Sequence, residues 1–364
     1  MSLRRLDLTD FRVFPSARFA PERDGTTVIT GANGTGKTSV LEALAYLGTR
    51  RSFRGAPTDA LVRGGADSAI VRADIEGADS PVTVEAEIRL AGRSRTKVNY
   101  KITTARKDLA AAAPCTVFSP DDLSLVSGAP RGRRDLLDDA LGALDAPGAR
   151  AADDVERVLR QRGALLRQAA GRATPEVDAS LDVWDERLAE AGVALVAARE
   201  TLTKALGALV REAYARLAGA ARARGPGEEL VSLSYGTSWQ GDLREALAAS
   251  RREDLRRAVN TVGPHRDDVV LAIEGREART HASQGEQRSL ALALRLGVHR
   301  LVCARTPLRP VLLLDDVFSE LDPSRSRALV QELPTGQSIV TTAVPLPAGM
   351  EVARVVEVTE LVAP

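Results

Sequence analysis

The chain has 364 residues, of which 44% are hydrophobic, so it is long enough to bury a large core and to form two or three lobes. Its net charge of +1 excludes attraction of nucleic acid by the chain as a whole, so any such binding must come from local clusters of basic residues. The chain has two isolated cysteines, Cys115 and Cys303, which argue against a disulfide scaffold or a zinc site. No run reaches the roughly 18 apolar residues of a membrane span. We therefore expect a cytoplasmic protein without membrane contact.

A glycine-rich loop, GANGTGKT at residues 31–38, follows an apolar strand at 26–30 and precedes a helix at 38–46. Glycines permit positive φ values, so successive backbone N–H groups can point at the phosphates of ATP. A purely structural glycine turn is the alternative, and the flanking strand and helix argue against it. We therefore predict that Lys37 binds the β- and γ-phosphates and serves catalysis, that the Thr38 hydroxyl binds Mg²⁺, and that ATP contacts Gly31, Ala32, Asn33, Gly34, Thr35, Gly36, Lys37, Thr38 and Ser39.

Alternating apolar and polar residues at 69–77 and 81–92 predict antiparallel strands, with residues 91–102 as the tip and return of this β-meander. Six basic residues and no acidic residue lie between positions 91 and 107. Basic side chains spaced by two share one face of a strand, which suits a DNA phosphate backbone, although a solvated hairpin is the alternative. We predict DNA contacts without base-specific readout at Arg93, Arg95, Lys97 and Lys101. A second candidate group for DNA contact is interpreted instead as a salt-bridged helix surface: Arg131, Arg133, Arg134, Arg157 and Arg160.

The middle of the chain is predicted to be helical. Helical spacing begins at residue 153, stops at a loop at 171–177 and resumes in a long helix at about 179–219. A coiled coil and a packed helical hairpin both explain leucines that recur every seven residues. Because the repeat stops quickly, we favour the hairpin; the leucines are Leu188, Leu195, Leu202 and Leu209. A linker at 221–229 then leads to strands at 230–236 and 269–275.

Two motifs near the end of the chain are expected to complete the nucleotide site. PVLLLDD at 310–316 predicts a parallel strand that is buried on both faces and ends in two carboxylates. Asp315 is predicted to bind Mg²⁺ and Asp316 to polarise the attacking water, with capping of the next helix as the alternative. SQGEQRSLALAL at 283–294 resembles the signature helix of ABC-type ATPases, although Ser283 and Glu286 would also form an ordinary capping box.

These motifs predict an α/β fold: an ABC-type P-loop ATPase head, with a mixed sheet, an antiparallel β-meander and a helical second lobe. Residues 1–128 would begin ATPase lobe I, residues 129–228 would form helical lobe II, and residues 229–364 would return to the ATPase core. In such heads the signature serine meets the γ-phosphate of the other subunit. We therefore predict an ATP-dependent homodimer in which three residues act on the partner's nucleotide: Ser283, Gln284 and Gly285.

Seven segments, in order, resemble those of the RecF family, bacterial DNA-repair ATPases related to SMC heads: LDLTDFRVF, GANGTGKTSVLEAL, RSFR, FSPDDL, GPHRDD, SQGEQR and LLLDDVFSELD. FSPDDL and GPHRDD point to this family rather than to ABC ATPases in general. The resemblance implies ATP and Mg²⁺ as cofactors, weak DNA-stimulated ATP hydrolysis and no long coiled coil. It also implies action with RecO and RecR in loading RecA at gaps and at junctions of single- and double-stranded DNA, in fork maintenance and in SOS induction.

Three positions depart from a general ABC ATPase. Asp121 and Asp122 replace the usual Q-loop glutamine, Thr341 and Thr342 end a strand where transporters place a histidine, and Asp316 is shorter than the common glutamate. These departures predict slow turnover and argue against a transporter subunit. An SMC-like structural head and a scaffold that binds ATP without significant turnover are the remaining alternatives. His265, within GPHRDD, is interpreted as a core or hinge residue rather than as a catalytic base.

Overall fold

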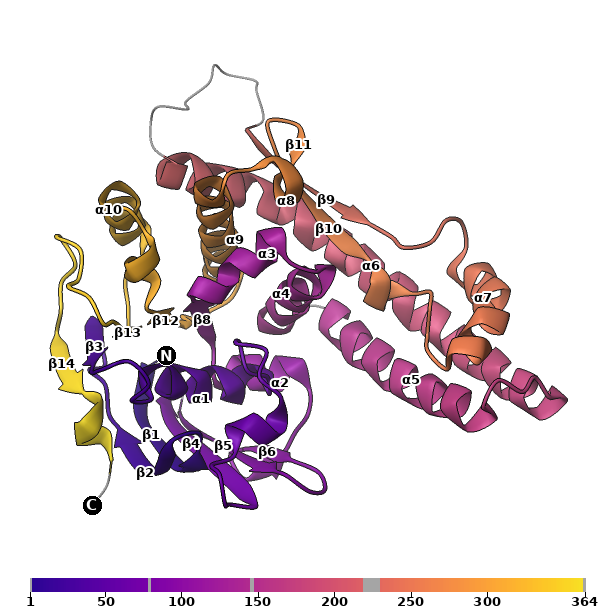
Figure 1. The fold of residues 1–364 in the computed structure, drawn as a ribbon, viewed down its shortest axis with the longest axis horizontal. Coiled ribbons are helices and arrows are strands. Elements are labelled where there is room, and N and C mark those ends of the chain that lie inside the picture. The colour runs from indigo at the N-terminus through magenta and orange to yellow at the C-terminus, as the bar shows by residue number, and fades with distance from the viewer. Residues whose placement is uncertain (1, 78–79, 145–146, 219–229, 363–364) are drawn as a thin grey trace.

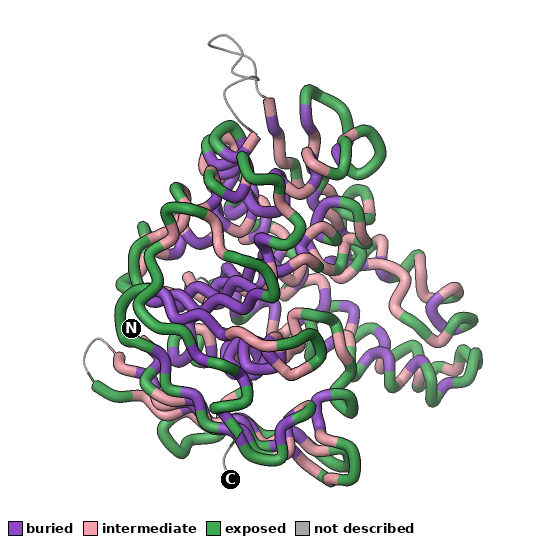
Figure 2. Tube along the Cα trace, turned by 60° about the vertical axis from the view of Figure 1, so that its left-hand side comes forward, coloured by how far each residue is buried: buried purple, intermediate pink, exposed green. Residues whose placement is uncertain are grey.

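The structure is a computed structural model that describes residues 2–77, 80–144, 147–218 and 230–362. These residues form three sheets, and long helices extend from one side of the molecule (Figure 1). Buried residues run through the middle of the molecule, and exposed residues gather on its outer loops (Figure 2). None of the helices in these ranges combines the length and the apolar character that a membrane crossing requires.

The central sheet brings the two ends of the chain together. Its five parallel strands are, in spatial order, β14 (Arg354–Glu357), β3 (Thr26–Thr30), β13 (Ser338–Thr341), β12 (Val311–Asp315) and β8 (Cys115–Phe118). Successive residues of a strand face opposite sides, so Leu313 belongs to the core that contains α1 (Lys37–Thr49), while Leu312 and Leu314 belong to the core that contains α9 (Gln284–Arg305). The predicted doubly buried strand is confirmed, and β13 alone separates it from β3.

An antiparallel sheet covers the other side of α1. Its strands are, in order, β2 (Phe14–Phe19), β1 (Ser2–Phe11), β4 (Ser68–Glu76), β5 (Pro81–Arg89), β6 (Arg95–Val98) and β7 (Lys101–Ile102). Leu6, Val71 and Val84 are fully buried and share one core with Leu41 and Leu44 of α1. The predicted β-meander is confirmed, and its packing fixes α1 in place.

The middle of the chain forms α2 (Arg106–Ala112), α3 (Ser124–Ser127), α4 (Pro130–Ala143), α5 (Pro147–Ala169) and α6 (Pro175–Ala218). The 44 residues of α6 span about 66 Å and pack against α5 and α9. Leu188, Leu195 and Leu202 are at most 3% exposed within the same core as α9, so the predicted helical hairpin is confirmed and the coiled coil is wrong. The predicted linker at 221–229 lies outside the described residues, as does Gly219.

The third sheet consists of β11 (Arg276–Glu277), β10 (Asp268–Ile273) and β9 (Val231–Gly236), and it packs on α6 through Val231 and Leu271. The remaining helices are α7 (Leu243–Arg257), near the outer end of α6, α8 (Ala278–His281) and α10 (Pro323–Glu332). The division of the chain at residues 128 and 228 stays a prediction, because β9 and β10 share a core with both α6 and the central sheet.

Candidate functional site

The glycine-rich loop connects the end of β3 to the start of α1. Gly31, Gly34 and Gly36 have φ values of 145°, 81° and 102°, which other residues rarely adopt. A β-carbon on Gly36 would also lie 2.7 Å from Phe14 Cζ and from Val13 Cγ2. Position 36 therefore needs glycine for its backbone conformation and for the close approach of the turn between β1 and β2.

Lys37 is the first residue of α1 and is only 8% exposed. Its Nζ donates hydrogen bonds to the carbonyl oxygens of Gly31, at 2.7 Å, and Ala32, at 2.9 Å. The positive end of the α1 dipole lies at the same loop. Asn33 is exposed at the loop tip, whereas Ser39 is buried in the first turn of α1. The loop, the ammonium group and the helix start together form a site for an anion.

A hydroxyl–carboxylate pair lies directly behind the loop. Thr38 Oγ1 donates to Asp315 Oδ1 over 2.7 Å, which joins the start of α1 to the end of β12. Thr341 Oγ1, at the end of β13, donates to the same oxygen over 2.7 Å. Burial raises the pKa of the Asp315 carboxyl, and the two hydroxyl hydrogen bonds oppose that rise. The structure thus brings together the two predicted Mg²⁺ ligands.

Asp316 adopts a left-handed backbone conformation with φ of 47°, which is uncommon for residues other than glycine. Its N–H donates to the carbonyl oxygen of Thr341 over 3.0 Å. Its Oδ1 is buried and has no hydrogen-bond partner within the described part of the chain. A buried, unpartnered carboxylate oxygen next to the Thr38–Asp315 pair fits the all-oxygen coordination that Mg²⁺ prefers.

The start of α9 is capped as the sequence indicates. Ser283 Oγ accepts from the N–H of Glu286 at 3.4 Å, and Glu286 Oε2 accepts from the N–H of Ser283 at 2.7 Å. Ser283 and Gln284 are exposed. Gly285 has a close neighbour, because a β-carbon there would lie 2.8 Å from Arg325 Nη2. Arg325, from the start of α10, is therefore a further site residue that the sequence reasoning missed.

The two halves of the expected ATP site are not brought together within one chain. Figure 1 places α8 and the start of α9 toward the upper edge of the view, well apart from α1 in the lower half. Arg325 stays with the start of α9, because its Nε donates to Ser289 Oγ over 3.2 Å. The exposed start of α9 thus lies apart from the phosphate loop of its own chain.

The family model described as RecF/RecN/SMC N terminal domain matches residues 2–358. The DNA replication and repair protein RecF of Frankia alni is 41% identical to this chain over 357 residues, with 94% of each chain covered. The RecF protein of Acidothermus cellulolyticus is 39% identical over 337 residues, with 90% of each chain covered. This chain belongs to the RecF family. The predicted family is therefore confirmed.

Solved structures of RecF resemble this chain over nearly its whole length. A recombination mediator protein described as RecF-ATP has a TM-score of 0.82 and 26% identity, covering 98% of this chain and 95% of that one. The Smc head domain of Pyrococcus furiosus, with an extended coiled coil, has a TM-score of 0.51 and 16% identity over 94% of this chain and 90% of that one, which shows a shared fold alone. The predicted ABC-type ATPase head is confirmed.

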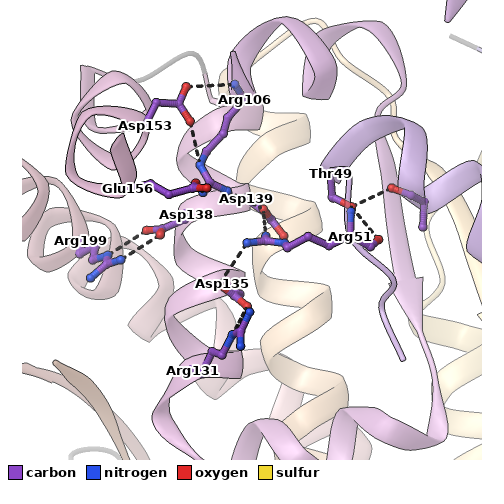
Figure 3. A network of polar contacts seen from close by, with 11 residues as sticks. Thr49, Arg51, Arg106, Arg131, Asp135, Asp138, Asp139, Asp153, Glu156 and Arg199 are labelled. Atoms are coloured by element: carbon purple, nitrogen blue, oxygen red, sulfur yellow. Dashed lines mark hydrogen bonds and ion pairs between the residues drawn. The ribbon is translucent and has the colours of Figure 1, made fainter. Parts of the chain in front are cut away.

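A network of ion pairs connects this RecF-family nucleotide site to the helices beyond it (Figure 3). Arg51, just after α1, pairs with Asp139 and, over 3.1 Å, with Asp135, both on α4. Arg106 of α2 pairs over 3.0 Å with Asp153 on α5. The segment RSFR, at residues 51–54, was predicted only to resemble a RecF segment. The structure shows that its first arginine anchors the end of the phosphate-loop helix to α4.

The residues that differ from a general ABC ATPase lie in different environments in the structure. Asp122 is buried, caps the turn that begins at Pro120 and pairs with Arg295 over 2.7 Å, so it supports the fold. Asp121 is exposed. Thr341 instead belongs to the nucleotide site, because it holds Asp315. His265 is partly buried, and burial lowers its pKa to about 4, which keeps the imidazole neutral.

The basic hairpin lies at the edge of the antiparallel sheet. Arg95 and Lys97 share one face of β6, because buried Thr96 lies between them on the other. Lys97 pairs with Glu85 over 3.0 Å, whereas no ion pair forms at Arg93, Arg95 or Lys101 within the described ranges. Three exposed basic residues thus remain without an acidic partner, beside the 77% exposed Tyr100 at the turn to β7.

The second basic group forms the salt-bridged surface that the sequence predicts. Arg133 is 5% exposed and pairs with Asp268 over 2.7 Å, and Arg134 donates to the carbonyl oxygen of Asp267 over 2.5 Å. The other members also have acidic partners within the helices: Arg131 with Asp135, Arg157 with Asp154, and Arg160 with Glu156.

Proposed function

We propose that this protein is an ATP-dependent, DNA-binding ATPase of the RecF pathway of recombinational repair. The observation that carries the proposal is the hydrogen-bonded Thr38–Asp315 pair directly behind a glycine-rich loop that holds Lys37. A related solved structure is described as RecF-ATP, which supports ATP as the ligand of this loop. Membership of a family of DNA replication and repair proteins supports DNA as the macromolecule on which it acts.

The residues of the site divide the chemistry of ATP hydrolysis among them. Lys37 and the loop N–H groups bind the phosphates, while Thr38 and Asp315 hold Mg²⁺. Mg²⁺ held by these two residues would supply positive charge that neutralises the phosphates. Asp316 orients the attacking water and accepts its proton as the bond between the γ-phosphorus and the bridging oxygen breaks, which releases ADP and phosphate. Its short side chain favours slow turnover, which suits a switch.

Two protomers complete each site in a two-fold symmetric dimer. The exposed start of α9, with Ser283, Gln284 and Gly285, contacts the γ-phosphate on the partner. The Arg325 guanidinium, which pairs with Asp322 over 2.5 Å, lies over Gly285 where that phosphate arrives. ATP thus holds the dimer together, because neither protomer presents both halves of the site to the same nucleotide.

The cellular role follows from family membership. We propose that the dimer clamps duplex DNA and junctions of single- and double-stranded DNA at gaps in the cytoplasm, and that RecO and RecR act with it to load RecA. Fork maintenance and SOS induction are the expected consequences. The proposed contacts avoid base edges, so binding depends on backbone charge and weakens as salt rises.

Light scattering tests the proposed function directly. The Asp316→Asn variant, which should bind ATP without cleaving it, is measured at saturating Mg·ADP, at saturating Mg·ATP, and at Mg·ATP with duplex DNA. We expect a mass near 38.7 kDa with ADP, twice that mass with ATP, and a larger complex when DNA is added. A monomer at saturating ATP and high protein concentration would contradict the proposal. Phosphate release by the unmodified protein separates an ATPase from a scaffold that only binds ATP.

The basic hairpin is expected to contribute to DNA affinity. Replacing Arg93 and Arg95 by glutamine removes two charges that have no acidic partner, so the slope of log affinity against log salt should fall by about 1.8. Fluorescence anisotropy with labelled duplex DNA across a salt series measures this change. Arg18→Gln is the control, because Arg18 is exposed at the opposite edge of the same sheet. If the hairpin variant and the unmodified protein show the same slope of log affinity against log salt, the hairpin is solvated and does not contact DNA.

A further inference from the structure

A separate notch lies at the outer end of the helices, between α5, the end of α7 and the turn Pro264–Arg266. Its volume is about 290 Å³. Three arginines line it, Arg160, Arg167 and Arg266, and none of its described lining residues is acidic. The notch is thus a concave, positively charged feature on a chain whose net charge is only +1.

Asn260 organises the floor of the notch. Its carbonyl oxygen accepts hydrogen bonds from His265 Nε2 and from Arg266 Nη2, both at 3.0 Å. Its side-chain amide donates to the carbonyl oxygen of Leu159 over 3.1 Å, which ties the loop after α7 to α5. Because these contacts form within the chain, the notch keeps its shape without a ligand.

A buried ion-pair network lies beneath this floor. Arg162 is fully buried and pairs with Asp185 of α6 over 2.7 Å and with Asp254 of α7 over 2.6 Å. Its Nη1 also donates to Asn260 Oδ1 over 2.7 Å. Asp185 also pairs with Arg251 over 2.7 Å, so the two buried carboxylates are shared between two arginines that do not line the notch.

The arginines of the notch have little compensation. Arg266 makes its side-chain contacts with a neutral carbonyl, and Arg160 has one exposed pair with Glu156 at 3.3 Å. Arg167 forms no ion pair in the described part of the chain. Its Nη1 lies 3.4 Å from the position of a β-carbon on Gly163, so its guanidinium lies beside the preceding turn of α5, where Gly163 lines the notch. The positive charges of the three arginines that line the notch repel each other, and a bound anion would offset this repulsion.

We propose that the notch binds a backbone phosphate of duplex DNA, as a second DNA contact apart from the β6–β7 hairpin. The proposal rests on the DNA-binding function proposed above. Guanidinium groups donate paired hydrogen bonds that match the geometry of a phosphate. The notch contains no Phe, Tyr or Trp among its described lining residues, which favours a phosphate over an acidic protein surface.

The test compares Arg167→Gln/Arg266→Gln with a matched control in full-length protein. Arg150→Gln removes one positive charge from an exposed position on α5, which matches the single variant Arg167→Gln, and its 17-residue separation from Arg167 corresponds to about 25 Å along the helix. Anisotropy of labelled duplex DNA is measured with Mg·ATP at about 50 to 200 mM salt. We expect the double variant to bind DNA about tenfold more weakly, with a salt slope smaller by about 1.8, and the control to match the unmodified protein.

The outcomes separate the notch from the function on which it rests. If the unmodified protein binds DNA and the double variant binds it equally, the notch is not a DNA contact while the proposed function stands. If the unmodified protein binds no DNA at any salt concentration, the proposed function fails as well. The Arg167→Lys/Arg266→Lys variant should keep the salt slope, because charge remains, but lose part of the affinity. If the double variant unfolds at a lower temperature than the unmodified protein, the single variant Arg167→Gln is tested instead. It should change the salt slope by half as much as the double variant.

Discussion

Replacing Lys37 by methionine is expected to abolish ATP-dependent dimerisation. The Lys37 ammonium lies within 2.9 Å of two carbonyl oxygens of the loop, so it is already positioned where the β- and γ-phosphates are expected. Methionine keeps most of the side-chain length and removes the charge. Loss of one partner of a desolvated charge pair costs about 2–5 kcal/mol, so ATP should bind at least about 30-fold more weakly. Titration with a fluorescent ATP analogue measures this loss, and light scattering measures the mass.

Lys204→Met provides the control for this variant, because it makes the same substitution at an exposed position on α6. It should bind ATP and dimerise like the unmodified protein. Thermal unfolding of both variants without nucleotide shows whether the fold is intact. A Lys37→Met protein that doubles its mass with ATP would refute the role assigned to Lys37, whatever its rate of hydrolysis.

The parts of the site that depend on local sequence were predictable. A glycine-rich loop between a strand and a helix specifies its own backbone conformation, so the positions of Lys37 and Thr38 follow from the motif. An apolar run that ends in two acids predicts a doubly buried strand, so Asp315 was placed correctly at its end. A fixed pattern over a few residues determines each of these features.

Contacts between distant segments were not predictable in the same way. Arg51 pairs with Asp135 and Asp139, more than 80 residues later, and nothing in either segment alone identifies the other. The approach of the Arg325 guanidinium to Gly285 could not be predicted for the same reason, because the two residues lie in different segments. Thr341 was noted only as a position without histidine, because its hydrogen bond to Asp315 depends on the order of strands in the sheet.

The helix starts show a different kind of error. The sequence places the start of α5 at residue 153, whereas the helix begins at Pro147. Its first turns bury small residues such as Ala149 and Ala152, which give no large apolar side chains from which to recognise a period. The predicted loop at 171–177 is too long, because α6 begins at Pro175. Proline at a helix start has a suitable φ and lacks the N–H that would have no helical partner there, so this residue was the available signal.

Replacing Ser283 by arginine is expected to leave ATP binding intact and to block pairing of protomers. Ser283 is exposed at the start of α9, away from the phosphate loop of its own chain, so the first ATP contact does not involve it. Arginine is too large for a position that closes on a phosphate, and it places a second guanidinium near Arg325. The loss of the cap costs the helix about 1 kcal/mol, which the folded chain should tolerate. We expect an ATP affinity within twofold of the unmodified protein and no doubling of mass with Mg·ATP by light scattering.

Two substitutions at the same position distinguish an interface residue from a helix cap. Ser283→Thr retains a hydroxyl that can cap α9 and should still dimerise. Ser283→Asp also caps a helix well, but its negative charge would repel the partner's γ-phosphate, so it should remain a monomer. A cap role alone predicts that Ser283→Asp dimerises normally and that only Ser283→Arg is weakened. If Ser283→Arg and Ser283→Asp both formed normal ATP-dependent dimers, α9 would not complete the site of the partner. Neither the larger arginine side chain nor the negative charge of aspartate would then lie against the partner's γ-phosphate.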